Sequence, residues 1–387
     1  MNKKELELYI HIPFCVRKCS YCDFLSAPAT EQTREAYMAA LFAEIGGRAK
    51  DYSDRTVTSI FIGGGTPSLL SGEQIGQLMD RIREQFAMAQ DAEITMEVNP
   101  GTANAEKLRN FYTAGINRLS IGMQSAQAEE LKNLGRIHDF EGFCQVYREA
   151  VEAGFTNINV DIMSGLPGQT LASYRDTLEK VLHLEPMPQH ISAYSLIVEE
   201  GTPFAAMAER GELPLPEEET ERAMYEETIE VLAKYGFHRY EISNYARDGY
   251  ECRHNVGYWI RRDYLGFGIG AASLIDNVRF QNEKSLGAYL AQPLESREEE
   301  QTLTVQDRME ETMFLGLRLT RGVSCVDFAE QYGRTVEEVY GEVIARNVAD
   351  GLLTVTERKE NQKKDRFLAL TKRGLDLSNY VMAQFLF

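Results

Sequence analysis

Three cysteines with the spacing Cx3CxxC, Cys15, Cys19 and Cys22, are the residues of this sequence best suited to chemistry. Thiolates bind transition metals, and three of them leave one position of a four-coordinate site open. An iron–sulfur cluster bound in this way keeps one iron free for another ligand. Two other interpretations of the spacing remain: a structural zinc site with a fourth ligand from elsewhere, and three unrelated thiols.

A glycine run and several polar side chains follow predicted strands further along the chain. Residues 63–67 (GGGTP) come after an apolar run, and glycines there let the backbone approach a ligand closely. The run matches neither the dinucleotide-binding pattern nor a P-loop. Glu97, Gln124 and Asp161 lie in or at the ends of later strands, and each alone fits a buried polar group. Together with Arg136 they indicate one pocket.

The only tryptophan of the chain lies in the run His254-Asn255-Val256-Gly257-Tyr258-Trp259. This run is either an aromatic patch that packs against the main domain or a site for a flat aromatic ligand. In the second interpretation, the imidazole of His254 is available to an axial metal position.

Alternating strand-like and helix-like segments must position these residues. Their alternation predicts repeated βα units and an α/β fold with a parallel sheet. Six strands are too few for a closed eight-stranded barrel, so a partial TIM-like barrel is preferred, with an open doubly wound sheet as the alternative. The strands are expected at 8–12, 59–62, 94–98, 118–123, 157–163 and 191–197, and the helices at 35–49, 72–86, 106–114, 140–152 and 171–183.

Changes in composition divide the chain into three predicted parts. Residues 1–235 form the partial-barrel core, 236–295 a segment that completes the barrel, and 296–387 a C-terminal domain. The charged, proline-containing stretch 211–221 predicts a surface connection before a helix. The acidic stretch 293–301 predicts a solvated linker or the start of a helix.

The C-terminal domain is predicted to be small, helical and winged-helix-like, because helical patterns precede two short strands around a charged turn. The DNA-binding form of this fold needs a basic face, whereas residues 358–366 carry charges of both signs. A structural role or contact with a partner is therefore expected. The helices are expected at 308–317, 325–332 and 336–350, and the strands at 352–356 and 366–370.

Composition limits the class of protein. The formal charge of −18 argues against nucleic-acid binding, because a phosphate backbone would be repelled over most of the surface. No apolar run has transmembrane length, and the first seven residues do not resemble a signal peptide. The six cysteines do not form a disulfide framework, which predicts a reducing, cytoplasmic location.

Together these motifs resemble the radical S-adenosylmethionine superfamily. The run YIHIPFC at 9–15 and the order of later motifs are similar, over nearly the whole chain, to the oxygen-independent coproporphyrinogen oxidase family. The resemblance implies a partial (β/α)6 barrel and a [4Fe–4S] cluster on the three cysteines, with S-adenosylmethionine on the fourth iron. The cofactor contacts that it implies are Tyr9, Gly64, Gly65, Thr66, Glu97, Gln124, Arg136 and Asp161.

The residues after Cys22 separate two branches of this family. The oxidases resemble Cx3CxxCxC and have a longer N-terminal arm, whereas Asp23 and Phe24 follow Cys22 here. The chain instead resembles the HemW-type haem chaperones in its CxYCxF run and in an HNxxYW motif at 254–259. One departure is Ala272, where many relatives carry histidine in a Gly-Ala-His-Ser run, and this puts in doubt any role carried over to that loop.

The chaperone resemblance implies binding of haem and its delivery to acceptor haem proteins, and it assigns no catalytic residue. His254 is the candidate haem contact, and the resemblance does not settle the axial ligand. An oxygen-independent coproporphyrinogen III oxidase is the alternative, and a radical enzyme for another substrate is the third interpretation. Respiratory acceptors would bring the chain into peripheral contact with a membrane, although no amphipathic anchor is evident. Dimerisation on cluster assembly is an open question, and nucleic acid is not an expected partner.

Overall fold

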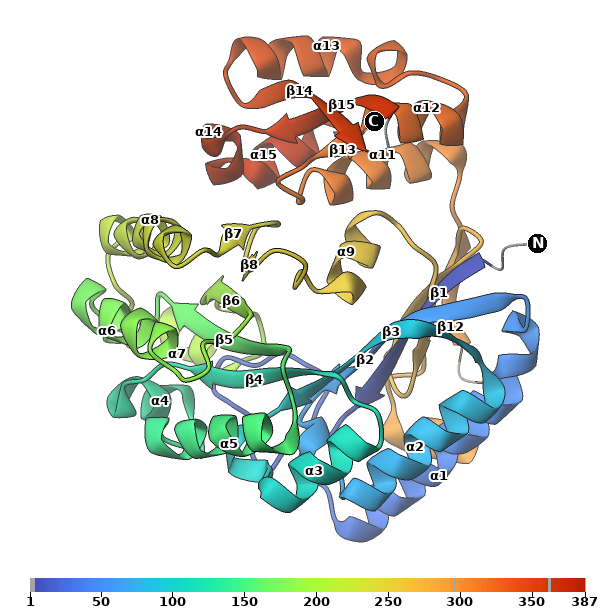
Figure 1. Cartoon of the computed structure of the whole chain (residues 1–387), viewed down its shortest axis with the longest axis vertical. Coiled ribbons are helices and arrows are strands. Elements are labelled where there is room, and N and C mark those ends of the chain that lie inside the picture. Colours follow the sequence, from blue (N-terminus) through green and yellow to red (C-terminus); the bar gives the residue numbers. More distant parts are fainter. Residues whose placement is uncertain (1–3, 296, 361–362, 387) are drawn as a thin grey trace.

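One open sheet of twelve strands forms the main layer of the structure (Figure 1). The structure is a computed structural model that describes residues 4–295, 297–360 and 363–386. The strand order is β12-β11-β10-β9-β1-β2-β3-β4-β5-β6-β8-β7, and the six central strands run parallel in chain order. This confirms the predicted partial barrel. The six strands are β1 (Lys4–Ile12), β2 (Arg55–Gly64), β3 (Ala87–Val98), β4 (Arg118–Gln124), β5 (Ile158–Ser164) and β6 (His190–Ser195).

Helices cover the outer face of this sheet (Figure 1). The alternation of side chains along a strand explains the arrangement. On β1, Leu8 and Ile10 are fully buried in the main hydrophobic cluster, whereas Tyr9 lies on the opposite face and lines a cavity. The covering helices are α1 (Glu31–Arg48), α2 (Gly72–Gln85), α3 (Ala105–Thr113), α4 (Ala128–Leu134), α5 (Phe140–Ala153), α6 (Leu171–Leu182) and α8 (Glu218–Lys234).

The sheet continues beyond the six expected strands at both edges. Strand β9 (Tyr264–Phe267) pairs parallel with β1, and β8 (Asn244–Ala246) pairs antiparallel with β6 and with β7 (His238–Arg239). Strands β10 (Ala272–Ile275) and β11 (Val278–Asn282) follow β9. These strands have only two to five residues each, too few to show a hydrophobic period in the sequence.

The expectation of a linker or helix start at 293–301 is wrong, because residues 297–302 form the edge strand β12 (Arg297–Thr302). Every residue of β12 is exposed, and its pairing with β11 uses backbone groups. With no buried side chain, the strand leaves no hydrophobic pattern for the sequence to reveal. Its charged side chains suit an edge strand, because they discourage pairing with another chain.

A buried carboxylate ties the added strands to the first helix. Glu44 on α1 accepts hydrogen bonds from the Gly268 N–H, at 2.9 Å, and from the Tyr289 hydroxyl, at 2.7 Å. It also accepts one from the Asn282 amide and pairs with Arg48, both at 2.7 Å. Because Asn282 ends β11 and Tyr289 lies on α10 (Leu286–Ala291), this one side chain fixes β11 against the barrel.

The C-terminal part has its own hydrophobic cluster around Phe328, Tyr340 and Phe385. Its three-stranded sheet has the order β13-β15-β14, and its elements follow the winged-helix order that the sequence predicts. They are α11 (Val305–Gly316), β13 (Val323–Ser324), α12 (Cys325–Tyr332), α13 (Val336–Ala349), β14 (Leu353–Glu360), β15 (Lys363–Leu370), α14 (Lys372–Asp376) and α15 (Ser378–Ala383). None of the described helices is long and apolar enough to cross a bilayer.

Candidate functional site

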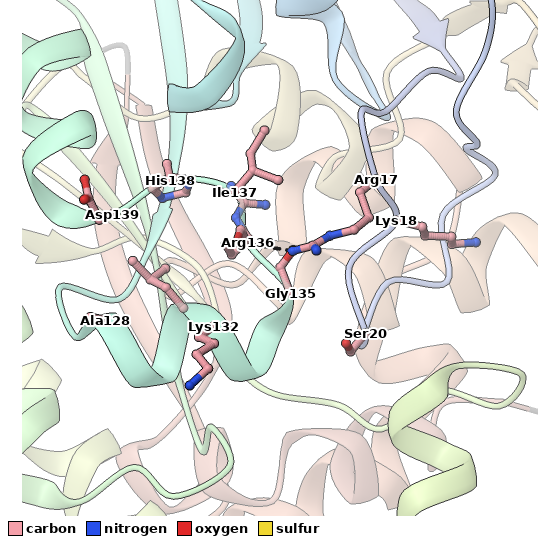
Figure 2. A pocket seen from close by; sticks show the side chains of 11 residues that line it. Arg17, Lys18, Ser20, Ala128, Lys132, Gly135, Arg136, Ile137, His138 and Asp139 are labelled. Carbon is pink, nitrogen blue, oxygen red and sulfur yellow. Dashed lines mark hydrogen bonds between the residues drawn. The ribbon is translucent and has the colours of Figure 1, made fainter.

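The three cysteines lie on the loop that joins β1 to α1, at the carboxyl ends of the parallel strands. The loop is held at several points. Its start pairs with its end, since the Cys15 N–H donates to the Ala27 carbonyl at 3.1 Å. Its middle is held by the end of α4: the Ser20 N–H donates to the Leu134 carbonyl at 3.0 Å, and the Arg17 guanidinium donates to the Gly135 carbonyl at 2.6 Å (Figure 2).

A cavity of about 370 Å³ lies between this loop and the strand ends, and we call it the first cavity. The structure brings ten of the twelve residues predicted for a site to its lining. These ten are Cys15, Cys19, Cys22, Gly64, Gly65, Thr66, Glu97, Gln124, Arg136 and Asp161. The three half-buried thiols face the cavity without a closed ligand set, and no group of three His, Cys, Asp or Glu in metal-binding geometry occurs in the described ranges.

The glycine run packs directly against the start of the cysteine loop. The Gly65 N–H donates to the Ile12 carbonyl at 2.8 Å, and the Thr66 N–H donates to the Phe14 carbonyl at 2.7 Å. A Cβ at Gly65 would lie 2.6 Å from the Phe14 carbonyl oxygen, which is backbone and cannot move aside cheaply. Gly64 has a φ of 109°, a conformation that favours glycine. The Thr66 hydroxyl then reaches the Cys15 sulfur at 3.5 Å.

Two carboxyl groups lie in the first cavity. Glu97 accepts a hydrogen bond from the Gly64 N–H at 3.0 Å, and Asp161 accepts one from the Asn159 amide at 2.7 Å. Burial, and to a smaller extent the nearby Asp161, raise the pKa of Glu97 to about 8. Burial also raises the pKa of Asp161, against the hydrogen bonds from Asn159 and Ser120. A ligand that brings hydrogen-bond donors or positive charge would stabilise the ionised form of both groups.

Arg136 places a positive charge of the first cavity beside a thiol. Its Nη2 donates to the Gly122 carbonyl at 2.7 Å, and its Nη1 lies 3.8 Å from the Cys19 sulfur. Its Nε is buried and has no hydrogen-bond partner among the residues that the structure describes. An unpartnered buried donor is rare, so this atom marks a place for an acceptor on a ligand.

The floor of the first cavity contains a polar network that motif spacing alone does not reveal. Asn159 donates to the Ser120 hydroxyl at 2.8 Å and lies 2.6 Å from His190 Nδ1. Ser192 donates to Asn159 at 3.1 Å, and the fully buried Arg118 lies on the same lining. Ser120 on β4 and Asn159 on β5 stand at even spacing from the predicted Gln124 and Asp161. The two-residue period of a strand is therefore the signal that could have found them.

A second cavity of about 550 Å³ adjoins the first, and the two linings share Phe24, Gly64 and Glu97. Aromatic side chains form much of its wall. They come from β1, from α9 (Arg253–Trp259) and from β9, and they are Tyr9, Tyr258, Trp259 and Tyr264. Leu315 from α11 closes the side toward the C-terminal domain. Figure 1 shows α9 between the sheet and this domain.

Tyr9 was expected to contact the cofactor of the first cavity, and the structure places it on the wall of the second. Its hydroxyl lies 3.0 Å from His11 Nδ1, and His11 Nε2 lies 2.9 Å from the Leu25 carbonyl. Both ring nitrogens of His11 are therefore occupied although the residue lines the second cavity. Ala272, the departure noted in the sequence, also lines this cavity.

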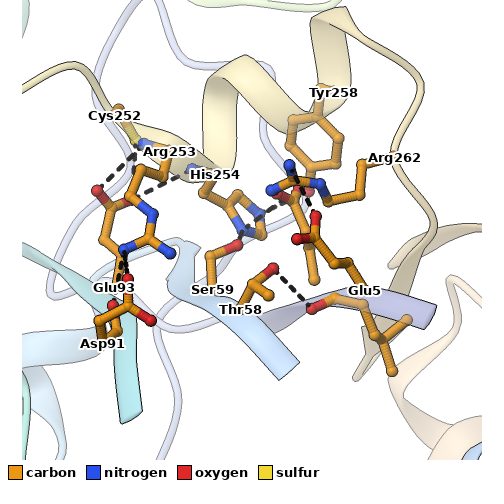
Figure 3. Close-up of polar contacts among 12 residues, drawn as sticks. Glu5, Thr58, Ser59, Asp91, Glu93, Cys252, Arg253, His254, Tyr258 and Arg262 are labelled. Carbon is orange, nitrogen blue, oxygen red and sulfur yellow. Dashed lines mark hydrogen bonds and ion pairs between the residues drawn. The ribbon is translucent and has the colours of Figure 1, made fainter. Parts of the chain in front are cut away.

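Helix α9 is anchored by carboxylates on the strands beneath it (Figure 3). Glu93 on β3 accepts hydrogen bonds from the Arg253 N–H at 3.1 Å and the His254 N–H at 3.2 Å. Its carboxylate thus satisfies the first N–H groups of the helix. Gly257 packs on Glu7 of β1 so closely that a Cβ there would lie 1.9 Å from the carboxyl oxygen. A larger residue at that position of the motif would force the Glu7 carboxyl to move.

His254 lines neither cavity and instead joins α9 to the strand beneath it. Its Nδ1 lies 2.8 Å from the Ser59 hydroxyl and its Nε2 lies 3.0 Å from the Tyr258 hydroxyl. The ring is buried, and burial together with Arg118 lowers the pKa of His254 to about 3. The expected contact of His254 with haem does not match this position, because the sequence could not show which side of α9 the imidazole occupies.

Comparison with known proteins places the chain in a family. The radical SAM superfamily matches residues 9–181, and the HemN C-terminal domain matches residues 303–377. The heme chaperone HemW of Bacillus subtilis (strain 168) is 38% identical over 382 residues, which cover 98% of both chains. The same-named protein of Lactococcus lactis subsp. lactis (strain IL1403) is 36% identical over 100% of this chain and 98% of its own.

The chain belongs to the HemW family of radical SAM proteins. A HemW relative from Escherichia coli (strain K12) is 42% identical over 69% of each chain. Among solved structures, the coproporphyrinogen III oxidase HemN of Escherichia coli, a radical SAM enzyme, superposes with a TM-score of 0.84. It is 28% identical, and the match covers 99% of this HemW-family chain and 90% of HemN.

The partly buried carboxyl of Glu97 makes stability depend on pH. Between the ordinary pKa of glutamate and about 8, the folded chain binds a proton there that the unfolded chain has lost. Wild-type stability therefore falls as pH rises through this range. The Glu97→Gln variant should lose this dependence. Between about pH 5 and about pH 9, its free energy of unfolding should rise relative to that of wild type by on the order of 3 kcal/mol. Urea unfolding of the ligand-free chain measures the difference.

The matched control is Glu106→Gln, an exposed carboxylate on α3. This variant should show the pH dependence of wild type. Equal pH profiles for Glu97→Gln and wild type would contradict the placement of Glu97 in a water-poor cavity.

Proposed function

We propose that this chain is a haem chaperone, which binds haem in the second cavity and delivers it to acceptor haem proteins. The observation that carries the proposal is the form of that cavity: aromatic side chains line it, and it opens beside the first cavity through Phe24, Gly64 and Glu97. Its volume of about 550 Å³ is within the range of small-molecule sites. The family relationship to heme chaperones over the whole chain supports the same conclusion.

The second part of the proposal is a [4Fe–4S] cluster on Cys15, Cys19 and Cys22 with S-adenosylmethionine beside it in the first cavity. The donor set fits these groups, because three thiols, a free guanidinium N–H and two carboxyls line one space. When bound, the reduced cluster supplies the electron that can cleave the sulfonium of S-adenosylmethionine. The radical SAM superfamily match supports this assignment.

Different residues of the first cavity would bind different groups of S-adenosylmethionine. Arg136 offers its unpartnered Nε–H to a carboxylate, as guanidinium groups commonly do. Backbone groups of Gly64 and Gly65 can approach an ammonium group because neither residue has a side chain there. Glu97 offers its oxygens to a pair of ribose hydroxyls. The remaining contacts that we propose are Thr66, Gln124 and Asp161.

The second candidate function is oxygen-independent oxidation of coproporphyrinogen III. The superposition on HemN favours it, because the fold is shared over nearly the whole chain. The same tetrapyrrole-sized cavity would then hold a substrate. The residues after Cys22 favour the chaperone, because Phe24 stands where the oxidase pattern has its further cysteine and its side chain lines both cavities.

Location and partners follow from this function. We propose a cytoplasmic protein whose acceptors include respiratory haem proteins, with delivery at the membrane surface and no nucleic-acid partner. We also propose that a homodimer forms when the cluster is assembled. Size measurement before and after anaerobic cluster assembly would test the dimer.

The Cys19→Ser variant should lose the visible absorption of the cluster after anaerobic reconstitution. Two thiolates cannot replace the three that hold such a cluster with an open iron. Iron and sulfide analysis with absorption spectra measures the loss. Cys144→Ser is the matched control, because Cys144 is half-buried on α5 and lines neither cavity. Full absorption in Cys19→Ser would show that the three-cysteine assignment is wrong.

Haem binding is tested by titration of the chain with haem, followed by the Soret band. Trp259→Leu should weaken binding about tenfold, because it removes an aromatic face from the second cavity. Tyr380→Leu, on the exposed surface of α15, should bind as wild type does. The same reconstituted sample is then given coproporphyrinogen III. Decarboxylation with turnover would overturn the chaperone proposal in favour of the oxidase.

A further inference from the structure

A single arginine stands among the aromatic residues of the second cavity. Of the described residues that line this cavity, only Arg279 on β11 carries a formal positive charge. Its side chain is 39% exposed. A guanidinium beside flat aromatic walls is the arrangement that recognises an aromatic ligand with a carboxylate on its edge.

In this structure the guanidinium of Arg279 is held by a carboxylate of the chain itself. Arg279 Nη1 lies 2.8 Å from Glu311 Oε1, and the other oxygen of Glu311 lies 2.8 Å from Arg261 Nε. Glu311 is on α11 of the C-terminal domain, one turn before Leu315, which lines the cavity. The carboxylate of Glu311 therefore sits at the edge of the cavity, in contact with its only cation.

We propose that Arg279 is the carboxylate-binding residue of the second cavity and that Glu311 occupies it until a carboxylate of the ligand takes its place. The proposal rests on the proposed function, and it names the ligand class: a flat aromatic macrocycle with free carboxylate groups, as haem has in its propionates. The exchange replaces one ion pair by another of the same type. No covalent bond is made or broken.

The second partner of Glu311 lowers the cost of the exchange. An unpaired buried carboxylate is costly, and the Glu311 side chain is only 7% exposed. Arg261 remains paired with it after Arg279 leaves, and Arg261 Nη2 is a buried donor with no partner among the described residues. Glu311 thus keeps a guanidinium in either state. Arg279 is the more exposed arginine, and its other side-chain partner is Tyr264, which lines the same cavity.

The exchange also connects the cavity to the C-terminal domain. Two cationic contacts hold α11 and the turn after it against the barrel at this place: the pair of arginines on Glu311, and Arg318, whose guanidinium lies 4.3 Å from the centre of the Trp259 ring. Binding of a ligand carboxylate by Arg279 leaves Glu311 with one arginine, Arg261, in place of two. Trp259, the only tryptophan of the chain, lines the second cavity, so its fluorescence reports ligand binding there.

The test compares two ligands with the full-length chain: haem, and haem dimethyl ester, in which both carboxylates are blocked. Affinity is measured by the Soret band and by Trp259 fluorescence. Arg279→Gln should weaken haem binding about tenfold and leave the ester unchanged. Glu311→Gln should tighten haem binding severalfold, again with no change for the ester. Arg279→Lys keeps the charge but not the fork of donors, so its haem affinity should lie between those of wild type and Arg279→Gln.

The matched control is Arg175→Gln, since Arg175 is paired with Glu227 far from the cavity. It should bind both ligands as wild type does. If Arg279→Gln weakens haem and ester equally, or if Glu311→Gln weakens haem although urea unfolding shows a folded chain, the exchange is wrong. If wild type binds no haem, the proposed function itself fails. Haem binding by wild type that Arg279→Gln leaves unchanged overturns only the role of Arg279.

Discussion

The close approach of two backbone segments is the constraint on which the rest of the site depends. The glycine run after β2 lies against the start of the cysteine loop, and the Gly65 and Thr66 N–H groups bond to carbonyls of that loop. A single added carbon at Gly65 would collide with the Phe14 carbonyl. This contact fixes the position of the three thiols relative to the strand ends. The thiols, Glu97 and Asp161 therefore line the same cavity.

Helix α9 divides this space into a polar half and an aromatic half. Asn255 faces the first cavity, whereas Tyr258 and Trp259 face the second. The anchoring carboxylate of Glu93 and the tight fit of Gly257 on Glu7 hold the helix in place. A radical SAM barrel thus presents two adjoining sites, one suited to the cofactor of its superfamily and one suited to a flat aromatic ligand. The C-terminal domain closes the second site through α11.

The sequence was sufficient for the parts of the structure that rest on long apolar periods or local motifs. The six parallel strands, their helices and the shared lining of Cys15, Glu97 and Asp161 could be predicted, because parallel strands end at one edge of a sheet. Strand β12 could not, since none of its side chains is buried. The orientation of His254 and the pairing of Arg279 with Glu311 depend on contacts between distant segments, which no local pattern encodes.

The most direct test of the central claim is a crystal structure of the chain with haem bound. The account predicts the porphyrin ring in the second cavity, against Trp259 and Tyr258, with one propionate on Arg279 and His254 still bonded to Ser59. Haem bound away from α9 would contradict the account. So would a haem iron ligated by His254, because that bond requires the imidazole to leave its present partners.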